Sequence, residues 1–471
     1  MQQNNLQKSG FSWPLFLRQV AVIAIPVALQ NLLTTTGSML DTVMVASLGP
    51  EAVGAMGLCA QFSSLMFSCY WGFVGGGMLF FSQYWGAGDT ESMERSYGVT
   101  LTFMMAVAFI FSGLALLRPD AVMRLYTDKE VFHGIGISYL RIVGLAYPLQ
   151  VFSMAMASLL RSTERVKIPL YASICSVVTN VLLNWLLIFG HLGFPRMGIQ
   201  GAATATVCAG LVNVLVMLVL GRKCEYLFHV KNHFRWKKST LRIYFQKCAP
   251  ILANELLIGV GNMIINIVLG RQAEEAIAAL AVVRTLEGLV IGFFAGFANA
   301  GSILVGKEVG AGRLETAWQR GWRLTYLCMG TIFVICAGLV IFRGNILHLM
   351  GLRDASLAAG RGMLTIYCCA AVIRMGNWAQ NDIYRAGGDA AFGTILEITF
   401  MFLMVVPCVY LTGIRWHLSY LIVFACCYAD EIIRFVLMQL HMKSGRWVKP
   451  VTEQGRAALE EFRSVRGGKA A

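Results

Sequence analysis

The sequence predicts an all-α polytopic membrane protein with twelve transmembrane helices in two six-helix lobes, related by a pseudo-two-fold axis along the membrane normal. Three observations lead to this fold class. Of the 471 residues, 57% are hydrophobic and only 14% are charged, which is typical of a chain whose surface faces lipid. Apolar stretches of spanning length recur along the whole chain, and its two halves match at a constant offset.

The apolar stretches can each cross a bilayer, which takes about 20 mostly apolar residues per helix. No cleavable signal peptide is expected, because the polar N-terminal segment leads into an apolar stretch that is too long for one. The twelve predicted spans cover residues 17–47, 52–82, 97–117, 134–160, 168–190, 198–220, 244–269, 275–305, 322–342, 360–384, 392–413 and 417–441.

An internal repeat relates the two halves. Because six helices precede the second half, it enters the membrane in the same direction as the first, so the axis runs along the membrane normal and a central cavity lies between the lobes. Such an architecture suits alternating access. At an offset of 224 residues, the matches are Pro26 with Pro250, Glu51 with Glu275, residues 86–88 with 310–312, and Arg161 with Arg385.

The longest hydrophilic segment follows the sixth span and divides the chain. Its basic and aromatic residues suit a cytoplasmic linker that lies against anionic headgroups. In the tail we expect little fixed structure beyond a surface helix over residues 452–463. The predicted domains are an N-lobe with helices 1–6 (1–221), the basic linker (222–243), a C-lobe with helices 7–12 (244–442) and a cytoplasmic tail (443–471).

The basic residues lie mainly on one side of this topology. The segments on the side of both termini hold 26 of the 39 lysines and arginines. Cytoplasmic loops carry such an excess, so we predict a multi-pass protein of the plasma (inner) membrane with both termini cytoplasmic. The net charge of +14 then reflects topology, and no nucleic-acid partner is expected.

The first span contains a carboxylate, Asp41, where an unpaired charge costs at least about 2.5 kcal/mol. In the fifth span, Asn180 and Asn184 are four residues apart and share one helix face. The carboxylate and two amide oxygens could bind Na⁺, or the carboxylate could take up a proton. The alternative is an interhelical hydrogen bond that only holds spans one and five together.

Further polar residues could add to an ion site or a relay. Hydroxyl oxygens are offered by Thr34 in the first span and by Thr204 or Thr206 in the sixth. The second half instead concentrates charges at depths of about 12–21 Å along their helices. These charges either form internal salt bridges, such as Arg284 with Glu287, or act in function. In the second case they form a proton relay or a cavity wall that recognises charged substrate. They are Glu255, Arg284, Glu287, Arg374, Asp430 and Glu431.

Soluble-enzyme motifs and cofactor motifs are excluded. The segment 301–308 nearly fits a phosphate-binding loop, but Glu308 stands where the Mg²⁺-binding hydroxyl belongs. The sequence contains neither H-E-x-x-H nor G-x-S-x-G, and its 13 cysteines include no C-x-x-C. We therefore expect no catalytic residues, no enzyme activity and no cofactor other than a transported ion.

Five short motifs resemble those of the multidrug and toxic compound extrusion (MATE) transporters, over essentially the whole chain. The resemblance implies a transporter that exports amphipathic, often cationic, compounds in exchange for Na⁺ or H⁺ by alternating access. We expect it to act as a monomer. The motifs are IP…LDTVMVASLG from Ile25, SQYWGAGD from Ser82, AP…NE from Ala249, VGKEVGAGR from Val305 and YRAGGD from Tyr384.

The resemblance also assigns ion-site residues. Asp41 falls on the family's acidic position in the first helix, and Asn180 and Asn184 match the pair that completes an N-lobe cation site. In the C-lobe, a sodium-coupled branch uses acids in spans seven and ten. Here Glu255 lies one turn early, and Arg374 stands near the place of the second acid.

Two other function classes remain open at this point. A lipid-linked or polysaccharide flippase of the same broad superfamily would have a larger basic cavity and little ion dependence. A membrane-embedded enzyme would need a catalytic carboxylate or histidine pair in a large external loop, and the external segments are short. A channel is disfavoured, because the sequence has no selectivity-filter repeat.

Overall fold

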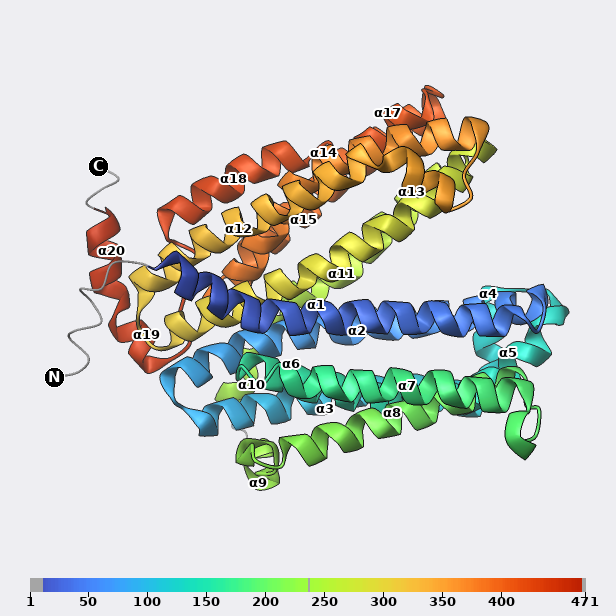
Figure 1. Cartoon of the computed structure of the whole chain (residues 1–471). Coiled ribbons are helices and arrows are strands. Elements are labelled where there is room, and N and C mark those ends of the chain that lie inside the picture. Colours follow the sequence, from blue (N-terminus) through green and yellow to red (C-terminus); the bar gives the residue numbers. More distant parts are fainter. Residues whose placement is uncertain (1–11, 236–237, 468–471) are drawn as a thin grey trace.

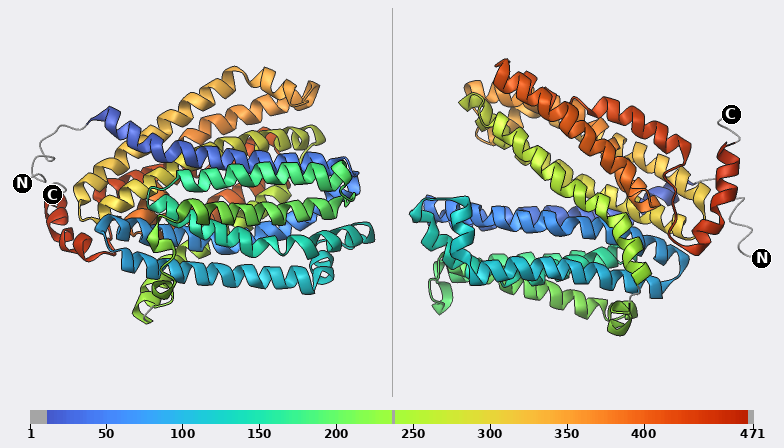
Figure 2. Two further views of the ribbon diagram at one scale, coloured as in Figure 1. Left: turned by 60° about the horizontal axis from the view of Figure 1, so that its bottom comes forward. Right: turned by 180° about the vertical axis from the view of Figure 1, so that it is seen from behind.

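The computed structural model of the chain describes residues 12–235 and 238–467, and within these ranges every regular element is a helix (Figure 1). The helices form two bundles, which correspond to the predicted N-lobe and C-lobe and diverge toward one end of the molecule (Figures 1 and 2). The first helix begins, and the last helix lies, at the other end. We call that end the terminus side and the opposite end the far side.

The N-lobe and the linker contain nine α-helices and two short 3₁₀ helices. They are α1 (Trp13–Ala46), α2 (Pro50–Ala87), α3 (Thr90–Leu117), α4 (Pro119–Tyr126), α5 (Glu130–Val143), α6 (Ala146–Ser162), α7 (Lys167–Phe189), η1 (His191–Gly193), α8 (Ile199–Gly221), η2 (Glu225–Leu227) and α9 (Val230–His233).

The C-lobe and the tail follow the same pattern, with two π-helical stretches. They are α10 (Lys238–Leu269), α11 (Glu274–Gly310), α12 (Leu314–Ile341), α13 (Arg343–Leu349), α14 (Asp354–Gly387), α15 (Ala390–Phe400), η3 (Met401–Val405), α16 (Val406–Tyr410), η4 (Leu411–Arg415), α17 (Tyr420–Cys426), α18 (Glu431–Ser444), α19 (Glu453–Ala457) and α20 (Leu459–Gly467).

The predicted all-α, twelve-helix fold is confirmed, with two departures from straight spans. Ten helical segments are long and apolar enough to cross a membrane, and α5 with α6 makes an eleventh that is bent by 47°. The twelfth crossing was predicted as one helix over 417–441, but it is broken into α17 and α18 by a turn at residues 427–430. The break coincides with Asp430 and Glu431, which face the C-lobe interior rather than lipid.

The pseudo-two-fold axis passes between the ends of α2 and α11. A Cβ atom added to Gly86 would overlap the carbonyl oxygen of Lys307, and one added to Gly310 would overlap that of Gln83. At the offset of 224 residues, Gly86 corresponds to Gly310 and Gln83 to Lys307, so the two contacts are equivalent by the internal symmetry. Only glycine allows the two backbones to approach this closely.

In the part of the chain that the structure describes, the lobes share a hydrophobic core on the terminus side alone. There, buried side chains of α2 such as Leu79 and Phe81 belong to the same cluster as Ile303 and Leu304 of α11. Toward the far side, the C-lobe has a core of its own around residues such as Val283 and Tyr367. The two lobes are therefore joined at one end and separate toward the other, as Figure 1 shows.

The helix expected over residues 452–463 is present as α19 and α20, but the tail also packs across this joint, where we expected little further fixed structure. Trp447 and Val448 are fully buried, and the backbone N–H of Val451 donates to Gln83 Oε1 at 2.9 Å. Thr452 Oγ1 donates to the carbonyl oxygen of Gly310 at 2.7 Å. The apolar side chains of the tail explain the difference, because burying them repays the ordering of the segment.

Asp389, between α14 and α15, also anchors the tail. Its carboxylate lies 2.9 Å from Lys449 Nζ and 3.1 Å from His441 Nε2. Burial acts to raise the pKa of Asp389, but the hydrogen bonds from His441 and Lys449 outweigh it, so the pKa is lowered from its usual value. The folded chain therefore favours the ionised form of this carboxyl group.

Candidate functional site

The structure brings Asp41, Asn180 and Asn184 together between α1 and α7. Asn184 Nδ2 donates both to Asp41 Oδ1 and, at 3.3 Å, to Asn180 Oδ1. Asn184 is fully buried, and its Oδ1 atom has no hydrogen-bond partner. The N-lobe thus holds one carboxylate and an unfilled amide oxygen side by side, which is a donor set for a proton or a hard monovalent cation.

The hydroxyl groups proposed from the sequence bond to their own helices instead. Thr34 Oγ1 donates to the carbonyl oxygen of Gln30, and Thr204 Oγ1 and Thr206 Oγ1 donate to those of Gln200 and Ala202. Such bonds to the preceding turn are common for threonine inside helices. The structure gives none of these three hydroxyl groups a contact with Asp41.

A cavity of about 320 Å³ lies between the lobes. Its wall comes from α1, α2 and α6 of the N-lobe and from α10, α11, α14, α15 and α18 of the C-lobe. The aromatic side chains of Trp71, Trp378 and Tyr428 give it apolar surface. Asp41, Asn180 and Asn184 are not part of this wall, so the N-lobe site and the cavity are separate places.

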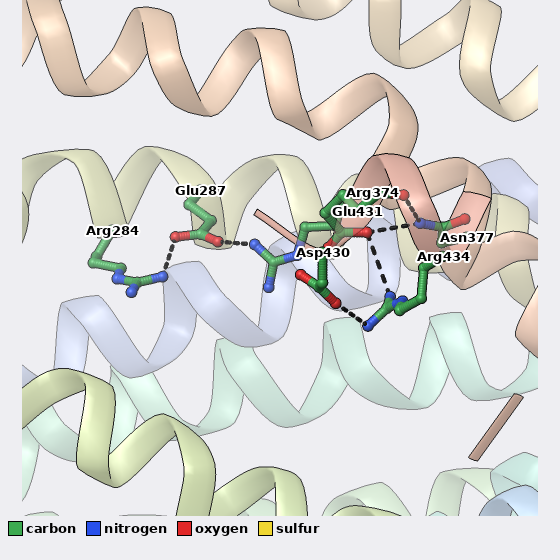
Figure 3. A network of polar contacts seen from close by, with 7 residues as sticks. All are labelled: Arg284, Glu287, Arg374, Asn377, Asp430, Glu431 and Arg434. Carbon is green, nitrogen blue, oxygen red and sulfur yellow. Dashed lines mark hydrogen bonds and ion pairs between the residues drawn. The ribbon is translucent and has the colours of Figure 1, made fainter. Parts of the chain in front are cut away.

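The C-lobe charges on one side of the cavity form a closed network (Figure 3). Glu287, which is 3% exposed, lies 2.6 Å from Arg284 Nη1 and 2.5 Å from Arg374 Nη1. Glu431 and Asp430 lie 3.4 and 3.2 Å from the guanidinium of Arg434. The network matches three guanidinium groups with three carboxylates.

This network shows how the C-lobe charges are paired. Arg284 pairs with Glu287, as its spacing of three residues suggested, and Arg434 pairs with Glu431 at the same spacing. Arg374 has no ion pair with Glu255. It reaches Glu287 on α11 and lies 3.8 Å from Glu431 on α18. Asn377 Nδ2 donates to Glu431 at 2.7 Å and completes the set.

Glu255 belongs to a second group of charges, nearer the terminus side. Its carboxylate lies 3.8 Å from Arg385 Nη1, and the carboxylate of Asp382 lies 3.7 Å from the same nitrogen. Glu397 on α15 accepts hydrogen bonds of 3.2 Å from Asn254 Nδ2 and Asn381 Nδ2. All of these residues line the cavity. We call Glu255, Asp382 and Glu397 the C-lobe acidic cluster.

Sequence reasoning missed Asp382 and Glu397, although a signal for them existed. At the offset of 224 residues they stand opposite Ser158 and Ser173, so a comparison of the repeats would have marked both as added charges. The equivalent of Arg385 is Arg161, which also lines the cavity and whose Nη2 donates to Gln30 Oε1 at 2.7 Å.

Comparisons with known proteins agree with this architecture. The MatE family model matches residues 26–186 and 250–411, one match in each half. The chain is 26% identical over 396 residues to the probable multidrug resistance protein YoeA of Bacillus subtilis (strain 168), which covers 82% of this chain and 85% of that relative.

A second relative and a solved structure extend the likeness. The probable multidrug resistance protein NorM of Rhizobium meliloti (strain 1021) is 24% identical over 315 residues, which is 65% of this chain and 66% of that relative. A crystal structure of MATE in the straight conformation has a TM-score of 0.81 at 18% identity, and covers 91% of this chain and 96% of that chain. The solved structure shares the fold.

Proposed function

The chain belongs to the MatE family of multidrug efflux transporters, and from this premise we propose that it is a cation-coupled antiporter. It exports amphipathic, cationic organic compounds through the cavity between its lobes, in exchange for Na⁺ or H⁺. The proposal includes that it is not an enzyme, that it acts as a monomer and that its only cofactor is the transported ion.

The observation that carries the proposal is the carboxylate of Asp41 between α1 and α7. Asp41 is half-buried, and a carboxylate within a membrane-spanning apolar helix is costly unless it binds a cation, takes a proton or is paired. Here its neighbour is the amide of Asn184, which carries no charge. No lysine or arginine of the described residues forms an ion pair with Asp41, so a transported cation would supply the missing charge.

Coupling between ion and substrate would run through α1. Asn31 of this helix lines the cavity and donates a 3.2 Å hydrogen bond to the carbonyl oxygen of Gly292 on α11. Asp41 lies ten residues further along the same helix, about 15 Å away. Ion and substrate therefore compete through a movement of α1 rather than by contact at one place.

The closed terminus side supports alternating access. The crossing of α2 and α11, the shared core and the tail all join the lobes at that end. We propose that these contacts open when the lobes rock to the other state. Because most basic loop residues lie on the terminus side, we further propose that it faces the cytoplasm of a plasma-membrane protein.

The charge of the cavity wall does not favour the flippase alternative. Counting its lining residues together with Glu287, the wall carries six carboxylates and five guanidinium groups. A cavity built for phosphate or for acidic sugars would instead present an excess of positive charge.

The test is export of a fluorescent cationic dye from proteoliposomes under a Na⁺ gradient alone and under a pH gradient alone. Export driven by one gradient in the wild type, and lost in Asp41→Asn, would support antiport and identify the ion. The proposal fails if neither gradient moves the dye, or if Asp41→Asn transports as fast as the wild type.

A further inference from the structure

The C-lobe acidic cluster is short of positive charge. Three carboxylates share one guanidinium, Arg385, which stays at 3.7–3.8 Å from Asp382 and Glu255 rather than at hydrogen-bonding distance. Glu397 has no ion pair within the described residues, and its two partners are neutral amides. The remaining cavity charges still leave a deficit, because the guanidinium groups of Arg284, Arg374 and Arg434 are matched by three carboxylates of their own. Arg161 is held by Gln30 on the opposite wall.

The cluster is also short of hydrogen-bond donors. Asn254 and Asn381 are 4% and 7% exposed, and the Nδ2 group of each donates a hydrogen bond to the same oxygen of Glu397. Their Oδ1 atoms are buried without a hydrogen-bond partner, and that of Asn381 packs against Gly393 on α15, where an added Cβ atom would overlap it. An unfilled buried acceptor costs about 1–3 kcal/mol, so Asn254 Oδ1 beside three carboxylates calls for a ligand that donates.

The fold does not require these carboxylates, as the N-lobe shows. There, Gln30 Nε2 donates to Ser173 Oγ at 2.9 Å, and the same pair of positions in the C-lobe is occupied by Asn254 and Glu397, at 3.2 Å. The helices thus make the same contact with a hydroxyl group that they make with a carboxylate. Keeping a charge in this interior is costly, which points to a ligand rather than to packing.

The spacing of the three carboxylates indicates which kind of ligand could bind them. They come from α10, α14 and α15, and among the described residues no three acidic, histidine or cysteine side chains converge on a common metal position. A ligand with several N–H groups can reach separated oxygens, whereas a quaternary or ring-delocalised cation has no N–H to donate. The aromatic rings of Trp71 and Trp378, on the same cavity, can cover an apolar body.

We propose that the C-lobe acidic cluster, with the free Oδ1 atom of Asn254, is the subsite for a hydrogen-bonding ammonium or amidinium group of the substrate. The transporter therefore prefers aryl-alkyl primary amines and amidines over quaternary cations of the same size. This inference rests on the proposed function, because it takes the cavity to be the substrate site.

The test measures binding of two matched probes to the purified full-length protein in lipid nanodiscs by titration calorimetry. The probes are a naphthylethyl primary ammonium and its N-trimethyl analogue, which share charge and apolar body but differ in N–H groups. We expect the primary ammonium to bind at least tenfold more tightly. Equal affinities, or tighter binding of the trimethyl probe, would overturn the proposal without any variant.

Substitutions test whether the C-lobe acidic cluster causes this preference for the primary ammonium. Glu397→Gln and Asp382→Asn should bring the ratio of the two affinities close to one, and Glu397→Asp should restore part of the preference. Ser158→Ala, at the position equivalent to Asp382, should leave the ratio unchanged. If a folded Glu397→Gln protein, monodisperse by size exclusion, keeps the full preference, the subsite lies elsewhere.

The outcome separates this inference from the proposed function. Gradient-driven export of a quaternary dye, together with equal affinity for both probes, would support the antiporter and rule out the subsite. Selective binding of the primary ammonium without transport under either gradient would support the subsite and rule out the antiporter.

Discussion

The two lobes repeat one helical pattern but place their candidate binding groups toward opposite ends. In the N-lobe the ion-site candidates lie about 8 Å from the far-side ends of α1 and α7, counting from Asp41 and Asn184. In the C-lobe, Asp382 and Glu397 lie about 8 and 10 Å from the terminus-side ends of α14 and α15. Among the described residues, neither lobe carries both groups of side chains.

Equivalent positions make the contrast plain. At the offset of 224, the N-lobe residues Asp41, Asn180 and Asn184 correspond to Ile265, Met404 and Cys408, whereas the C-lobe residues Glu255, Asp382 and Glu397 correspond to Asn31, Ser158 and Ser173. Both lobes fold alike with either set, so the fold itself requires neither set of polar residues. We interpret the lobes as specialised, one for the coupling ion and one for the substrate.

The largest expected effect is on transport. Asp41→Asn should lower gradient-driven dye export at least tenfold, because the only carboxylate of the N-lobe site is lost while the hydrogen bond to Asn184 can persist. Thr42→Ala is the matched control, since Thr42 is the next residue and its hydroxyl group bonds to the carbonyl oxygen of Ser38 on its own helix. A twofold change or less is expected there. Similar losses in both variants would contradict a specific role for Asp41.

The second prediction compares buried and exposed charges between the lobes. Arg374→Gln should lower the free energy of unfolding by about 3 kcal/mol, because it leaves the buried Glu287 with one guanidinium instead of two. Arg124→Gln breaks the exposed N-lobe pair with Asp120 and should cost about 0.5 kcal/mol or less. Thermal unfolding in detergent measures both. Equal costs would mean that the network is screened by cavity water.

The third prediction tests the symmetry of the joint. Gly86→Ala and Gly310→Ala should each cost about 2 kcal/mol, because either methyl group forces the ends of α2 and α11 apart. The double variant should cost less than the sum, since both changes open one crossing. Gly330→Ala is the control, because a Cβ atom there meets no heavy atom within 4 Å. The same unfolding assay applies, and a cost in only one of the two variants would contradict the two-fold contact.

The smallest expected effect concerns the tail, which Asp389 ties to the C-lobe. Asp389→Asn should cost about 1 kcal/mol at neutral pH. Because the folded-state pKa of Asp389 is lowered, the wild-type advantage is present above the unfolded value of about 3.9 and is lost as the pH falls through the folded value. Unfolding of both proteins at pH 7, 5 and 3 should show the full difference at the first two values and a smaller one at the third. A difference that is as large at pH 3 as at pH 7 would assign it to packing.

The sequence by itself determined the fold class, the repeat and the pairs within one helix. Apolar stretches of spanning length fix the crossings, because lipid leaves helices as the means of satisfying the backbone. Helical spacing placed Asn180 with Asn184 and Arg284 with Glu287, since residues three or four apart share a face. The internal offset also gave the axis between the lobes.

The tertiary structure decided which helices bring their polar residues together. Glu255, Asp382 and Glu397 come from three helices and line one cavity, whereas Asp41 lies outside it. Arg374 pairs with Glu287, and the tail packs where the two lobes meet. These contacts depend on crossing angles and on packing between different helices, as for Arg374 and Glu287, which are 87 positions apart. Periodicity along one helix carries no information about them, because it records which face is apolar and not which neighbour covers that face.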